Sequence, residues 1–151
     1  MKRIFVFLIA VLLSLTSFTS CKSEEISADT MLREFISSYG AEGVIYSSAC
    51  AEGEDGYLTE ETLNKIYVLD GRFPENYAIF LNSHTDYGSE CGVFVCDDAE
   101  MRLSVEEMCL ERIRLLCGKD NSFVTRSDNI VFYSTMQDRA KAEQLFKKII
   151  K

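Results

Sequence analysis

Residues 77–96 read YAIFLNSHTDYGSECGVFVC, and this stretch decides the fold class. It holds two short apolar runs, at 77–81 and 91–96, separated by a polar loop that is long for a hairpin. Both runs are rich in aromatic and β-branched residues, which is typical of strands. The stretch therefore predicts two neighbouring strands near the middle of the chain.

A helix is predicted to follow within residues 99–117, where apolar residues recur at three- and four-residue spacing. Two possible N-cap residues predict two different starts for this helix. The first is Asp98, and the second is Ser104, which forms a capping box with Glu107. Strand, strand and helix thus make one unit.

The same order returns in the last third of the chain. Apolar runs at 122–126 and 129–134 flank a turn, and a terminal helix is predicted over 136–150. Two such units predict an α+β fold, a two-layer sandwich in which helices cover one face of a four-stranded antiparallel sheet. The other face is then covered by an N-terminal helix, exposed to solvent or in contact with a partner.

An N-terminal helical region is predicted before these units. One amphipathic helix spans about 29–39, and a shorter one begins after Thr59 as its N-cap. Between them, residues 40–57 are glycine-punctuated and acidic. We expect an irregular segment there, with room for one short strand at 44–46.

The first 20 residues have the pattern of an export signal. Lys2 and Arg3 precede the apolar run IFVFLIAVLLSL at 4–15. A bilayer span needs about 20 apolar residues, so this run is too short for a permanent membrane helix. The sequence predicts a signal peptide at 1–20.

The end of this leader resembles a bacterial lipobox, which has an apolar residue, two small residues and a cysteine. Those positions hold Phe18, Thr19, Ser20 and Cys21. We therefore expect cleavage before Cys21 and lipidation of its thiol; the alternative is ordinary secretory cleavage that leaves Cys21 free.

This interpretation divides the chain into three parts. Residues 1–20 form the lipoprotein signal peptide, 21–28 a polar tether and 29–151 a single α+β domain. Removal of the leader takes away two cations and no acid, so the net charge moves from −8 to −10. This balance argues against nucleic acid as a partner, since phosphate backbones are bound by clustered Lys and Arg.

The spacing of the six cysteines predicts neither a disulfide framework nor a zinc site. Cys91 and Cys96 lie five residues apart on one predicted strand, so their side chains point to opposite faces. Cys109 and Cys117 are two helical turns apart, too far to bond directly. Small buried thiols are the expected role for most of them.

The sequence offers few candidate catalytic or metal-binding residues. The single histidine, His84, lies near Asp86 in the loop between the two strands, and a pair with Cys50 would make a thiol-dependent or hydrolytic enzyme conceivable. The acidic run at 51–61 fails as an EF-hand, because Thr62 stands where the bidentate glutamate belongs. No metal, cofactor or catalytic residue is predicted.

Several stretches together resemble a family of small lipoproteins from anaerobic Gram-positive bacteria that carry a domain of unknown function. They are the turn at 67–70 (YVLD), Glu90 before an apolar strand, Arg112 or Arg114 in the last turns of the long helix, and the tight turn at 128–129. The resemblance covers most of the chain after the leader. It implies an envelope location and no particular activity.

Two hypotheses follow. The preferred one is a binding or interaction domain, held on the extracytoplasmic side of the cell membrane by its lipid and facing an unidentified envelope protein or ligand through acidic loops or an open sheet face. The alternative is an envelope enzyme that uses Cys50 and His84.

Overall fold

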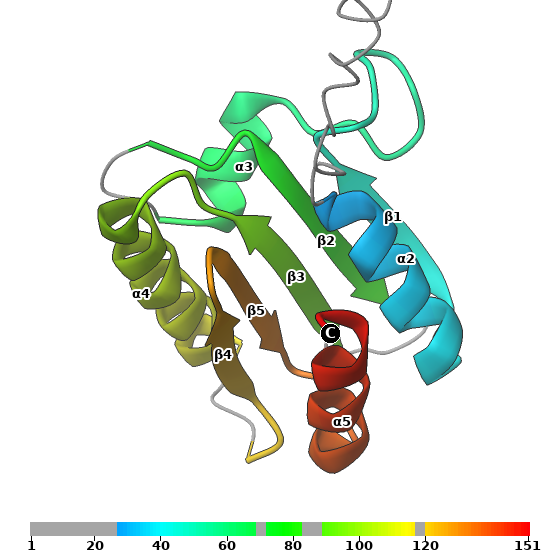
Figure 1. Cartoon of the computed structure of the whole chain (residues 1–151). Helices are drawn as coiled ribbons and strands as arrows, with labels where there is room; N and C mark the ends of the chain where they lie inside the picture. Colours follow the sequence, from blue (N-terminus) through cyan, green and yellow to red (C-terminus); the bar gives the residue numbers. More distant parts are fainter. Residues whose placement is uncertain (1–26, 69–71, 83–88, 117–119) are drawn as a thin grey trace, which may run out of the picture.

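The computed structural model describes residues 27–68, 72–82, 89–116 and 120–151, and Figure 1 shows how its elements are arranged. Over these ranges the chain forms four helices and five strands. In chain order they are α2 (Ala28–Tyr39), β1 (Gly43–Ser47), α3 (Glu60–Ile66), β2 (Asn76–Asn82), β3 (Glu90–Val95), α4 (Ala99–Leu115), β4 (Phe123–Ser127), β5 (Ile130–Ser134) and α5 (Arg139–Ile149).

The strands form one sheet in the order β1-β2-β3-β5-β4, and every neighbouring pair is antiparallel. The α+β class and the antiparallel pairing are confirmed. The prediction of four strands is wrong, because β1 adds a fifth at one edge, where Ile45 lies opposite Phe80. Its strand signal is weak since it is only five residues long and has glycine and acidic residues on either side.

Helices cover both faces of this sheet, and the predicted N-terminal helix α2 supplies part of this cover. The prediction that the helices of the two strand-strand-helix units share one face is wrong. α2 and α5 lie on one face, and α3 and α4 lie on the other (Figure 1). The reason is that consecutive residues of the central strands are apolar, and consecutive side chains point to opposite faces. All five residues of β5 are buried, which requires cover on both sides.

The helices are also distributed differently from the predicted N-terminal helical region. β1 separates α2 from α3, and these two helices pack on opposite faces of the sheet. The longest of the described helices, α4, has 17 residues and lies in the second half of the chain, as does α5. The two strand-strand-helix units thus send their helices to opposite faces.

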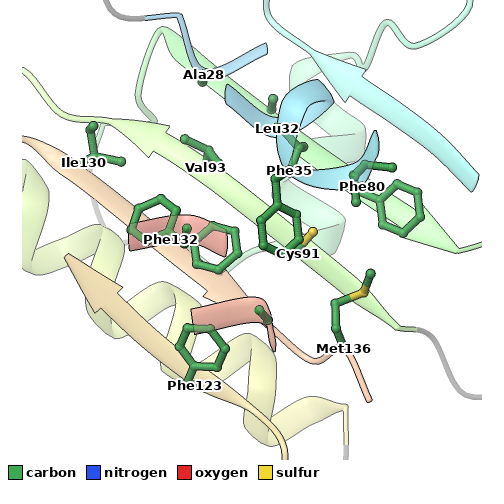
Figure 2. Close-up of a cluster of buried hydrophobic side chains, with 14 residues drawn as sticks. Ala28, Leu32, Phe35, Phe80, Cys91, Val93, Phe123, Ile130, Phe132 and Met136 are labelled. Atoms are coloured by element: carbon green, nitrogen blue, oxygen red, sulfur yellow. The ribbon is translucent and has the colours of Figure 1, made fainter. Parts of the chain in front are cut away.

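Aromatic rings dominate the layer between the sheet and α2 with α5, which Figure 2 shows in close-up. Phe132 of β5 lies at its centre. Its ring stacks on Phe146 of α5 at 4.3 Å between centroids and contacts Phe35 of α2 at 5.0 Å. One strand residue therefore joins both helices of this face.

The structure shows which of the two predicted capping signals starts α4. α4 begins at Ala99, and Asp98 is its N-cap, whose carboxylate accepts a hydrogen bond of 2.7 Å from the Met101 N–H. Arg72 donates a second one of 3.0 Å. Ser104 lies inside the helix instead, so the capping box is not used.

The Asp98 cap makes the stability of the domain depend on pH. Its pKa lies below the ordinary value, first because the Met101 N–H bonds the charged form and also because Arg72 is near. A lowered folded-state pKa contributes stability that is present above the unfolded pKa and is lost as the pH falls through the folded one.

We expect Asp98→Asn, which keeps an N-cap acceptor without the charge, to melt at a lower temperature than the wild type above about pH 4. This difference should shrink toward zero as the pH falls to about 2. Thermal melts of both proteins across this range measure it, and a difference that does not change with pH would contradict the assignment.

Candidate functional site

Glu90, the first residue of β3, carries a charged group that is almost completely buried, with 2% of its surface exposed. Its backbone is held by Thr135 through three hydrogen bonds. The Thr135 N–H and hydroxyl donate to the Glu90 carbonyl at 2.8 and 3.2 Å, and the Glu90 N–H donates to Thr135 Oγ1 at 2.9 Å. Because Cys91 faces α2 and α5, alternation turns the Glu90 side chain toward α3 and α4.

Arg112, in the last turns of α4, neutralises this carboxylate. Its Nε and Nη2 donate to the two carboxylate oxygens at 2.7 and 2.8 Å, which is the bidentate geometry of a strong charge-assisted pair. The third nitrogen, Nη1, donates to the Ile66 carbonyl at the end of α3, at 3.4 Å. One guanidinium thus ties β3, α3 and α4 together.

Two tyrosines extend the cluster. The Tyr133 hydroxyl of β5 donates to Glu90 Oε1 at 2.8 Å, and it lies 2.6 Å from the Tyr67 hydroxyl. The Arg112 guanidinium lies over the Tyr67 ring, 5.9 Å from its centroid, at a separation suited to a cation–π contact. We call these four residues, Tyr67, Glu90, Arg112 and Tyr133, the buried polar network.

Gly92 makes room for this arrangement. A Cβ at this position would lie 2.6 Å from Cε1 of Tyr133, closer than carbon atoms can approach. The missing side chain lets the Tyr133 ring lie against β3, and its hydroxyl then reaches Glu90. The glycine inside the apolar run CGVFVC therefore has a packing role.

The network holds a fixed set of charges near neutral pH. The hydrogen bonds to Glu90 raise the pKa of Arg112, and burial raises the pKa of both tyrosine hydroxyls well above the usual range. Arg112 therefore stays charged and both tyrosines stay neutral. These groups are suited to holding four elements in register, and neither tyrosine is poised to take up a proton as a general base.

Sequence reasoning accounts for part of this network. Only the family resemblance points to Glu90 and to the turn containing Tyr67, and it leaves Arg112 and Arg114 as alternatives. Arg112 is the residue that meets Glu90, whereas Arg114 is exposed and pairs with Glu111 at 2.7 Å. Tyr133 is missed, although a tyrosine inside the apolar run NIVFYS is a signal of a buried hydroxyl that needs a partner.

Of the candidate catalytic pair, the structure describes one member. Cys50 is half-buried in the turn that follows β1, with a free thiol. His84 and Asp86 lie outside the described residues, as does the lipidation candidate Cys21. The Cys50–His84 pair therefore stays a prediction.

Three other cysteines are buried free thiols. Cys91 packs in the layer under α2 and α5, and Cys96 packs under α3 and α4, so the prediction of opposite faces is confirmed. Burial raises the pKa of Cys96 to about 11 and that of Cys91 and Cys109 well above the ordinary range. These thiols therefore remain protonated near neutral pH and are poor nucleophiles.

The burial of these thiols predicts their reactivity. When the native protein is treated briefly with iodoacetamide at neutral pH, we expect Cys50 to be alkylated while Cys91, Cys96 and Cys109 react at least about 100-fold more slowly. Peptide mass spectrometry measures the alkylation rate of each cysteine. The denatured protein is the control, because unfolding should make these rates similar. Fast alkylation of Cys109 in the folded protein would contradict the packing described above.

The acidic segment after β1 folds on itself. A Glu54 carboxylate oxygen accepts from the Ala51 N–H at 2.8 Å, and Gly53 and Gly56 adopt positive φ angles. Within the described parts of the chain, no group of three or more His, Cys, Asp or Glu side chains gathers as a metal site would require. Of the described helices, none has the length and apolar character to cross a bilayer.

Comparison with known proteins gives no family assignment. No protein-family model, no curated protein and no solved structure matches this chain. The function must therefore be inferred from the residues themselves.

Proposed function

We propose that this chain is a lipoprotein, anchored to the membrane on its extracytoplasmic side, whose domain binds another component of the cell envelope. The observation that carries this proposal is the motif Phe18-Thr19-Ser20-Cys21 at the end of an apolar leader. The likeness to small lipoproteins of anaerobic Gram-positive bacteria supports the same location.

The position of the domain relative to Cys21 supports a short tether. Ser27 is the N-cap of α2, and only residues 22–26 separate it from Cys21. Six residue steps span at most about 20 Å. A lipid on Cys21 would therefore hold the domain against the membrane surface.

The binding role is supported by exposed apolar side chains on α4. Helices cover both faces of the sheet, so neither face is open to a partner. On the side of α4 that faces away from the sheet, Leu103 is 55% exposed and Leu110 is 47% exposed. Leu110 lines one groove with Val68, which is 72% exposed, and adjoining apolar side chains on a surface are typical of protein contacts.

The anchor is tested by the substitution Cys21→Ser. Because the thioether to diacylglycerol needs the sulfur, we expect this variant to lose labelling by radioactive palmitate and to leave the membrane fraction or remain unprocessed. Cys50→Ser is the matched control and should be labelled like the wild type. Palmitate on the Cys21→Ser protein would refute the anchor.

The binding role needs a separate experiment. A photo-crosslinking amino acid at position 107, on the exposed side of α4, should capture a reproducible neighbour in intact cells. The same group at position 52, in the acidic segment, is the control for random collisions. Equal and irreproducible capture from both positions would count against a binding surface on α4.

A further inference from the structure

Four residues form a straight line along α4. They are Leu103, Glu107, Leu110 and Arg114, spaced four, three and four residues apart, which places them on one side of a helix. We call them the outward stripe. The opposite side of α4, with Met101, Val105, Met108 and Cys109, is buried against the sheet.

A groove of about 410 Å³ runs beside this stripe. Val68, Met108 and Leu110 supply its apolar lining, and Glu107, Glu111 and Arg114 supply its charged rim. Val68 is 72% exposed, unusually open for a valine next to other apolar side chains. The stripe and the groove together form an unpaired helical surface suited to receiving another helix.

The charges on the stripe are arranged symmetrically about Leu110. Glu107 lies three residues before it and has no cationic partner within the described residues. Arg114 lies four residues after it and is 74% exposed, bonded to Glu111 of its own helix. Opposite charges thus flank an exposed leucine at almost equal distances.

This pattern is complementary to itself. We infer that the occupant of the stripe is a second copy of this chain, whose α4 packs antiparallel to the first with Leu110 at the two-fold axis. In this arrangement Glu107 of each copy meets Arg114 of the other, and the two Leu110 side chains contact each other. A parallel pairing about the same leucine would place Glu107 against Glu107, which is repulsive. The inference rests on the binding role proposed for the exposed side of α4, and it assigns that surface to a second copy of this chain instead of a different envelope component.

The test uses the full chain, expressed in the same cells with two different epitope tags and extracted in mild detergent. Wild-type copies should co-purify. Glu107→Arg paired with itself should lose co-purification by about tenfold or more, because two cations then meet at each contact. Arg114→Glu paired with itself should fail in the same way.

The decisive pair is Glu107→Arg with Arg114→Glu. One copy then carries cations at both 107 and 114, and the other carries anions at both. Each of the two contacts across the axis therefore joins opposite charges, so these two variants should co-purify with each other better than either does with itself. Absence of this recovery would overturn the inference, as would undiminished self-association of either single variant. Melting curves of the variants establish that they are folded.

Three further variants show whether the stripe itself forms the interface. Leu110→Gln should abolish co-purification, whereas Val44→Gln, at an exposed apolar residue on β1, should not alter it. Cys21→Ser in both copies should leave co-purification intact, since the contact lies in the domain. Loss of the complex in that variant would assign the association to the shared membrane anchor and overturn the stripe as the interface, without touching the anchor proposal itself.

Discussion

Replacement of Glu90 by glutamine is expected to lower the free energy of unfolding by about 3–5 kcal/mol. The variant keeps the size of the side chain but leaves the Arg112 guanidinium, which is 20% exposed, without its bidentate anion. A largely buried cation without a partner is costly because it has lost most of its water without gaining a counterion. Urea unfolding followed by circular dichroism measures the change.

Two controls show whether burial is the cause. The double variant Glu90→Gln/Arg112→Met removes both charges, and it should be more stable than Glu90→Gln alone. Glu61→Gln breaks an exposed pair with Lys65, whose side chains are 79% and 71% exposed, and should cost no more than about 1 kcal/mol. If Glu90→Gln and Glu61→Gln cost the same, the network does not stabilise the fold in this way.

Truncation of Phe132 to alanine is expected to destabilise the domain by a similar amount, about 3–5 kcal/mol. The ring is fully buried and contacts both α2 and α5, so its removal leaves a cavity that neither helix can fill without shifting. Phe132→Leu retains most of the volume and should cost clearly less. A loss below about 1 kcal/mol for the alanine variant would contradict the central position of this residue.

Most of the helices and strands can be predicted because the sequence signals for each lie within a few residues of one another. Short apolar runs identify β2 to β5, and amphipathic spacing identifies α2 and α5. The cap residue Thr59 is also correct, since its side chain accepts from the Thr62 N–H as an N-cap should. These features depend on residues only a few positions apart.

The arrangement of layers is harder to predict because it depends on both faces of each strand. In β2, Tyr77 and Ile79 pack under α3 and α4, while Ala78 and Phe80 pack under α2 and α5. When each strand is considered alone, such consecutive apolar residues predict that a strand forms but not which helices cover its two faces. Their consequence, a sheet buried on both sides, follows from the physical argument that each apolar face needs cover.

The buried polar network cannot be derived from spacing. Glu90 lies 22 residues before Arg112 and 43 before Tyr133, and only the antiparallel pairing of β3 with β5 brings Glu90 and Tyr133 together. The family resemblance points to Glu90 and offers two arginines. The helical phase chooses between them, because Arg112 shares the buried side of α4 with Met108 and Cys109, whereas Arg114 belongs to the outward stripe.

The most direct test of the lipoprotein assignment is mass spectrometry of the protein purified from membranes. We expect the mature chain to begin at Cys21 and its N-terminal peptide to carry the mass of a diacylglyceryl group on the thiol. A mature N-terminus at another residue, or an unmodified Cys21 in the membrane fraction, would contradict it.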